Sequence, residues 1–213
     1  MLEPKCASCR VLNCFGGKPE GNPTSCPTDN FQPLISEALG QYQEEGESRR
    51  IALAAAQTEA EGYGKWTRVQ ESVVFAKKLG ARKIGLATCL GLIDEARTAA
   101  EVFEKNGFEV VSACCKAGSI DKTTIGLADD EKVRPGQFEP ICNPISQARI
   151  FNQLGTDLNV MIGLCVGHDS LFLREAAAPS TVLVVKDRVL GHNPCAALYT
   201  SRFYYRKIFS EPS

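Results

Sequence analysis

Two patterns of hydrophobic and polar residues alternate along the second half of the chain. Short, continuous apolar runs predict buried β-strands, and between them apolar residues recur at helical spacing. Continuous apolar strands that alternate with amphipathic helices are typical of a parallel sheet covered on both faces. We therefore expect an α/β fold, a doubly wound and mostly parallel sheet of about four strands with helices on both faces. The predicted strands are 83–88, 108–113, 158–164 and 181–186, and the predicted helices between them are 93–105, 144–154 and 168–178.

Helical signals also precede the first predicted strand. Residues 34–44 and 47–61 have the composition of helices. Thr67, followed three residues later by Gln70, forms the signature of a capping box, which predicts a helix that begins there and ends at Gly80. The sheet is therefore expected to carry additional helices on its N-terminal side.

Residues 1–30 differ in composition from the rest of the chain. They hold four of the ten cysteines among Gly, Pro, Asn, Ser and Thr residues, with few large apolar side chains. Such a segment cannot fold on hydrophobic burial alone, so something else must order it. We predict two parts: a Cys-rich metal- or cluster-binding segment, 1–30, and an α/β domain with N-terminal helices, 31–213.

Composition and charge exclude several classes of protein. The chain has 24 basic and 25 acidic residues and no basic block, which argues against nucleic acid as a partner. It shows no secretory leader and no apolar stretch of about 18 residues, so we expect a cytoplasmic protein without a membrane partner. Ten cysteines in a cytoplasmic chain of 213 residues indicate metal binding or redox chemistry rather than disulfide bonds.

The N-terminal cysteines have a spacing that suits metal binding. They follow the pattern Cys6-x2-Cys9-x4-Cys14-x11-Cys26, in which the close pair can hold one metal ion or adjacent irons and the later cysteines complete four thiolates. Metal binding would then supply the folding free energy of the segment. The alternative is a disordered tail with free cysteines. Zinc and iron–sulfur clusters both accept four thiolates, and the spacing does not separate them.

The other six cysteines lie at the ends of predicted strands or at helix starts. They are Cys89, Cys114, Cys115, Cys142, Cys165 and Cys195. In an open parallel sheet, the carboxyl ends of the strands form the ligand crevice. We therefore predict a second metal or cluster site formed by Cys89, Cys115, Cys142 and Cys165, with Cys114 and Cys195 in reserve. The alternative is that these cysteines are small buried hydrophobic residues.

One of the two histidines belongs to the same predicted crevice. His168 follows Cys165 with the spacing Cys-x2-His, which could chelate one metal ion or place an imidazole beside a cluster. His168 and the adjacent Asp169 are therefore predicted as catalytic residues that move protons. The alternative is that both residues cap the following helix.

Four sequence motifs support a family resemblance. The N-terminal Cys-rich run, ATCLGL around Cys89, GLCVGHDSLF around Cys165 and VLVVKDRVLGHNP near the end resemble a prokaryotic family of predicted metal-binding proteins. This family is catalogued as domain of unknown function 1847, and the resemblance covers nearly the whole chain. It implies metal binding, and its members are typical of anaerobic bacteria and archaea, a setting that favours iron–sulfur clusters.

These observations lead to a main functional hypothesis and two alternatives. The main one is an iron–sulfur protein with [4Fe–4S] centres, used for electron transfer with a redox partner or for reductase- or desulfidase-like chemistry on a small molecule. The second is a non-enzymatic zinc protein that senses, stores or delivers metal. The third is thiol redox chemistry through Cys114 and Cys115 or through Cys165 alone.

Overall fold

The computed structural model describes residues 2–18 and 20–210. The chain forms two compact units, divided between Glu61 and Gly62, and each unit is described by itself.

The first unit consists of short elements followed by two longer helices. Both predicted helices, 34–44 and 47–61, are present with ends shifted by one or two residues, and none of the described residues from 2 to 53 is buried. This agrees with a segment that lacks a hydrophobic core. The predicted division at residue 30 stays a prediction. The helices are α1 (Asn13–Gly16), α2 (Pro27–Asn30), α3 (Gln32–Gln43) and α4 (Glu47–Gly62).

The second unit is built on a four-stranded sheet in which every pair of neighbouring strands is parallel. All four apolar runs predicted as strands are confirmed. The third is shorter than expected because Gly163 has a φ of +67°, a left-handed conformation that ends the strand at Ile162. In the order β2-β1-β3-β4, the strands are β1 (Lys83–Thr88), β2 (Glu109–Cys114), β3 (Leu158–Ile162) and β4 (Ser180–Val184).

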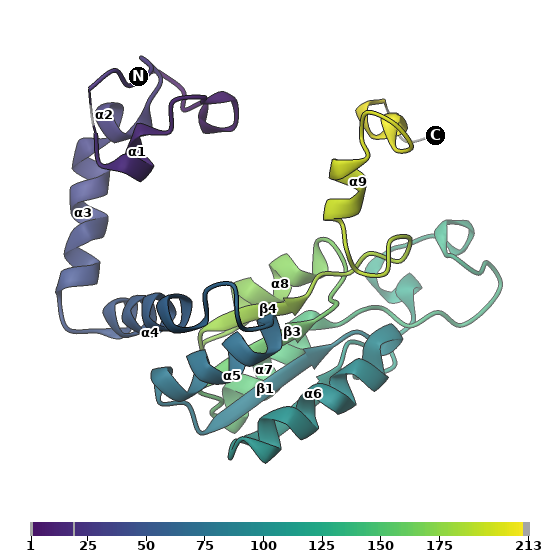
Figure 1. Ribbon diagram of the computed structural model, residues 1–213. Coiled ribbons are helices and arrows are strands. Elements are labelled where there is room, and N and C mark those ends of the chain that lie inside the picture. The colour runs from purple at the N-terminus through teal and green to yellow at the C-terminus, as the bar shows by residue number, and fades with distance from the viewer. Residues whose placement is uncertain (1, 19, 211–213) are drawn as a thin grey trace. The chain divides into compact units, whose positions relative to one another are not determined.

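Helices cover both faces of this sheet, as predicted for a doubly wound fold. One pair of helices lies on one face and a second pair lies on the other (Figure 1). The predicted capping box is present, with Thr67 and Gln70 exchanging hydrogen bonds at the start of the first helix. The first pair is α5 (Arg68–Leu79) and α6 (Ile93–Lys105), and the second pair is α7 (Pro144–Leu154) and α8 (His168–Glu175).

The core between the sheet and the second helix pair extends directly to the carboxyl edge of the strands. Phe151 of α7 and Phe172 of α8 are fully buried and pack edge to face, with ring centroids 6.1 Å apart. The same buried cluster includes Met161 of β3 and, at its edge, Cys89 and Cys115. The edge of the sheet is therefore held by a packed core.

The strand order places a topological switch point between β1 and β3. The connection from β1 to β2 runs to one side through α6, and the connection from β2 returns through α7 to β3 on the other side of β1. Ligands of open α/β sheets bind in the crevice at the carboxyl ends of the strands beside such a point. The loops after β1 and β3 therefore border the expected ligand crevice.

The long connection after β2 returns to the carboxyl edge of the sheet. It contains an antiparallel bridge between Asp121 and Pro140 and a buried lysine, Lys132, whose ammonium lies 3.0 Å from a carboxylate oxygen of Asp121 and 3.0 Å from one of Asp129. These contacts bring residue 142 back beside the end of β2.

The chain after β4 forms a loop and α9 (Cys195–Tyr199). Across the described ranges, no helix combines the length and the apolar character that crossing a membrane requires.

Candidate metal centre

A single pocket at the switch point brings together five residues predicted from the sequence. The residues that line it come from the ends of three strands and the starts of two helices, and they include four cysteines and one histidine. They are Cys89, Cys115, Cys142, Cys165 and His168, together with Pro144, Gln147 and Leu164. The reserve residues Cys114 and Cys195 do not line the pocket, and Cys195 is exposed. The predicted convergence is therefore observed, while the role of these residues as ligands stays a prediction.

Backbone hydrogen bonds position the cysteines that follow the strands. The Cys89 N–H donates to the Ile162 carbonyl at 3.0 Å, and the Cys115 N–H donates to the Thr88 carbonyl at 2.8 Å. Each bond continues the strand ladder by one residue. Both thiols are therefore held on the rigid edge of the sheet, and both residues are buried.

Cys142 is positioned by the start of α7. The next residue, Asn143, donates its N–H to the Cys115 carbonyl at 2.7 Å, and its side chain accepts the Ser146 N–H at 3.1 Å. This is the N-cap that the sequence predicts. The cap thus fixes the turn that places Cys142 beside Cys115.

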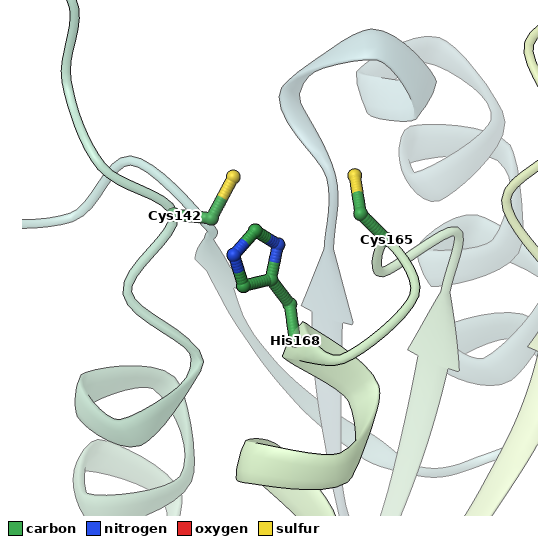
Figure 2. Close-up of side chains that lie close together, drawn as sticks. All are labelled: Cys142, Cys165 and His168. Atoms are coloured by element: carbon green, nitrogen blue, oxygen red, sulfur yellow. The ribbon is translucent and has the colours of Figure 1, made fainter. Parts of the chain in front are cut away.

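Cys142, Cys165 and His168 form a group that could hold a metal ion. Their two sulfur atoms and one ring nitrogen all lie within 4.8 Å of one another. Figure 2 shows the two thiols on either side of the imidazole ring, which projects from the start of α8. Ligand atoms of a tetrahedral zinc ion lie roughly 3.5 Å apart, so small side-chain movements would bring this group to a single ion.

Two buried side-chain atoms without a hydrogen-bond partner belong to this pocket. Among the described residues, the buried nitrogen and oxygen atoms without a partner are His168 Nδ1 and Gln147 Oε1. Buried polar groups in native proteins are nearly always paired, so two unpaired atoms in one pocket point to a missing ligand. An unpaired imidazole nitrogen beside two thiols fits a metal ligand.

The Cys115 thiol favours a thiolate at a neighbouring cysteine. Its single S–H can donate to Cys89 or to Cys142, and this bond lowers the pKa of the cysteine that accepts it well below the ordinary range. Hydrogen bonding to these cysteines and burial raise the pKa of Cys115. Burial also raises the pKa of Cys165, outweighing the charge of Arg188. Metals bind the thiolate form of cysteine, so a lowered pKa of Cys142 favours coordination at this residue.

Cationic side chains surround these sulfur atoms. Lys116 Nζ donates to Cys142 Sγ at 3.4 Å and to the Pro140 carbonyl at 2.6 Å, and Arg188 donates to Cys165 Sγ at 2.9 Å. Sequence reasoning missed both cations. Their signal was available, because Lys116 directly follows Cys115 and Arg188 follows β4 at the same edge of the sheet.

Gln147 was also missed. It is fully buried, and its amide nitrogen donates to the Thr88 carbonyl at 3.2 Å and to the Ala113 carbonyl at 2.6 Å, joining the ends of β1 and β2. A polar residue on the apolar side of α7, between Pro144 and Ala148, was the signal that could have identified it.

Asp169 lies outside the pocket that His168 lines. It is not among the residues that line the pocket, and its carboxylate accepts the Ser170 N–H at 2.8 Å within the first turn of α8. The N-cap of α8 is Gly167, and no side chain caps this helix end. Neither His168 nor Asp169 is therefore the N-cap, although the Asp169 carboxylate satisfies one N–H of the first turn, and the catalytic role predicted for Asp169 stays a prediction.

The four N-terminal cysteines are arranged differently. Cys6, Cys9, Cys14 and Cys26 all line one cavity of about 340 Å³. Among the described residues, the group of three or more potential ligands within 4.8 Å of one another is the crevice group, and these four sulfurs are not in it. These four cysteines therefore share a cavity without forming a close group of potential ligands.

Comparison with known proteins places the chain in a family. An uncharacterized protein of Methanocaldococcus jannaschii is 43% identical over 204 residues, which cover 96% of this chain and 97% of that protein. A family model described as a protein of unknown function (DUF1847) matches residues 26–183, a range that includes Cys26 and all five cysteine and histidine residues of the crevice. The resemblance based on sequence motifs is therefore confirmed, and the chain belongs to the DUF1847 family.

Proposed function

We propose that this protein is a cytoplasmic metalloprotein with two centres, an N-terminal [4Fe–4S] cluster and a metal site in the crevice that acts on a small molecule. The observation that carries the proposal is the convergence of Cys142, Cys165 and His168 at the switch point of the sheet, with His168 Nδ1 buried and unpaired. A switch point is where open α/β proteins bind their ligands.

The crevice group supports a single ion with an open position. Two thiolates and one imidazole form a donor set found in catalytic zinc sites, in which substrate or water takes the fourth position. A metal ion held there would act as a Lewis acid toward a bound small molecule. Cys89 and Cys115 stand beside the group and would either supply a fourth ligand or present a thiol to the substrate.

The N-terminal quartet supports a cluster that exchanges electrons with a redox partner. Its four cysteines line one cavity, and none of the described residues in the segment is buried. Cluster binding would therefore supply the energy that orders the segment. Together, the two centres suit a reductase- or desulfidase-like reaction on a small molecule.

A second candidate function is a zinc protein that senses, stores or delivers metal. The close spacing of the crevice ligands favours it, because one zinc ion needs ligand atoms in direct reach of a single point. In this alternative, the N-terminal quartet holds structural zinc after its sulfurs move together.

Anaerobic purification followed by visible spectroscopy and analysis of iron, sulfide and zinc tests the proposal. We expect a brown protein with about four irons and four sulfides per chain and one further metal ion. Cys14→Ser should remove the sulfide and leave the further ion, whereas Cys142→Ser should remove the ion and leave the sulfide. Cys195→Ser, which alters an exposed cysteine outside the pocket, is the matched control. A colourless protein that contains zinc and no sulfide would overturn the cluster and support the second candidate.

A further inference from the structure

The Lys186 side chain lies across the switch point and passes close to two glycines, Gly163 and Gly91. A β-carbon at position 163 would lie 3.6 Å from the Lys186 Cδ, and one at position 91 would lie 3.0 Å from its Nζ. The lysine stem therefore passes over the loop after β3, and the ammonium ends against the loop after β1, next to Cys89. A side chain at position 91 would displace the ammonium.

Lys186 is half-buried and forms no ion pair with a carboxylate of the described residues; the group that its charge favours is the Cys89 thiolate. Within the ranges that the structure describes, no carboxylate forms an ion pair with Lys186 or with Arg188, and no acceptor forms a hydrogen bond with Lys186. The intervening carboxylate, Asp187, accepts the N–H groups of Val189 and Leu190 at 2.9 and 2.8 Å. It is thus engaged in its own turn.

Charge in the crevice remains positive after metal binding. A divalent ion balances the two thiolates of Cys142 and Cys165, and this leaves the charges of Lys116, Lys186 and Arg188. Lys116 is directed to Cys142 and the Pro140 carbonyl. Lys186 and Arg188 come from the same loop after β4. Arg188 donates to Cys165 Sγ through one nitrogen, and its other N–H groups together with the Lys186 ammonium remain available to bind an anion. An ionised thiol at Cys89 would balance only part of this charge.

We propose that Lys186 and Arg188 bind the carboxylate or phosphate group of a small anionic substrate at the switch point, beside Cys89 and Cys165. This inference rests on the proposed function for the reaction itself and adds the class of substrate. Guanidinium and ammonium groups form charge-assisted hydrogen bonds with oxyanions, and the carboxyl edge of the sheet is where such ligands bind in this architecture. The anionic group would hold the rest of the molecule near the fourth position of the metal.

Calorimetric titration of the anaerobically purified protein with inorganic phosphate and, separately, with acetate tests this inference. We expect one of the two anions to bind, which identifies the group as phosphate or carboxylate. Lys186→Met keeps the apolar stem and should weaken binding at least about tenfold, the effect of one charged hydrogen bond. Arg188→Gln should act in the same direction, and Lys186→Arg should preserve binding.

Lys105→Gln is the matched control because Lys105 is an exposed cation at the end of α6, at the opposite edge of the sheet. Unchanged affinity in Lys186→Met, or no binding of either anion to the unaltered protein, would overturn the inference. Loss of crevice metal from Lys186→Met would also overturn the inference. The lysine would then serve to stabilise the thiolates that bind the metal and not to bind a substrate anion. If the unaltered protein lacks crevice metal but Lys186→Met still loses anion binding, the anion site stands and the proposed metal function fails.

Discussion

The two groups of cysteines differ in what holds them. The N-terminal quartet lies on short elements with no buried described residue up to position 53, and its four cysteines line a cavity. The crevice cysteines lie at the edge of a packed sheet, where Cys89 and Cys115 are part of the buried cluster. We expect metal binding to fold the N-terminal segment. In the sheet unit, by contrast, the packed fold itself positions the potential ligands.

The difference has a physical cause in the distribution of apolar residues. The sheet unit buries large side chains such as Phe103, Phe151 and Phe172 completely, so its strands are ordered without help from a metal. The N-terminal segment has no comparable burial. Removing metal should therefore disorder the N-terminal segment and leave the sheet unit folded.

The largest expected effect is the loss of order in residues 2–18 and 20–30 when the proposed N-terminal metal centre is removed. Binding free energies of structural metal sites are on the order of 10 kcal/mol, more than this segment can replace by burial. Cys9→Ser should make the segment sensitive to limited proteolysis, with cleavage sites identified by mass spectrometry, while residues 62–210 stay protected. If the segment resists proteolysis equally in Cys9→Ser and in the unaltered protein, it folds without metal. The two regions would then not differ in their dependence on metal.

In the crevice, loss of a ligand should affect metal binding and leave the fold intact. His168→Ala and Cys142→Ser should each lower crevice metal affinity by more than about 100-fold, above the range for changing a group that only supports a ligand. Metal competition assays measure the affinity, and urea unfolding of residues 62–210 measures stability, with Cys195→Ser as the control. Unfolding of the sheet together with metal loss would mean that the crevice also depends on metal for its structure.

A moderate effect is expected from Gln147, which joins β1 and β2 at the crevice. Gln147→Met leaves the Thr88 and Ala113 carbonyls without their shared donor, and this should cost about 2 kcal/mol of unfolding free energy. Gln153→Met, an exposed position on the same helix, is the control and should change stability little. Equal urea midpoints for the two variants would indicate that the Gln147 hydrogen bonds do not stabilise the edge of the sheet.

The smallest effect concerns acid sensitivity of the connection that carries Cys142. Backbone N–H groups of Thr123 and Glu139, and then Lys132, lower the pKa of Asp121 below its ordinary value of 3.8. A carboxylate with a lowered pKa stabilises the folded state above its ordinary pKa and loses this contribution as pH falls through the lowered value. Hydrogen exchange in residues 116–141 should therefore increase below about pH 4.

At neutral pH, Asp121→Asn should reproduce part of this increase. The control is Asp130→Asn, because Asp130 is exposed and lies in the same connection. If exchange in Asp121→Asn matches the control, the ion pair with Lys132 does not hold the connection in place.

Much of the fold and part of the site could be predicted because their signals are local. The capping box at Thr67, the N-cap at Asn143 and the four apolar runs each depend on a few neighbouring residues, and each is present. The end of β3 was predicted two residues too late. Gly163 continues the apolar run in the sequence, but its left-handed backbone conformation ends the strand. The position of Asp169 was also missed, because adjacent residues at a helix start point in different directions.

The sequence by itself determined that the chain forms an α/β sheet and that Cys89, Cys115 and Cys165 follow its strands, because hydrophobic period and turn residues act over short distances. Tertiary structure alone decided which atoms meet. Gln147, Lys116, Lys186 and Arg188 join the crevice through the order β2-β1-β3-β4, which brings segments up to about a hundred residues apart to one edge. The close group of potential ligands in the crevice and the cavity shared by the N-terminal cysteines likewise depend on packing that no local pattern records.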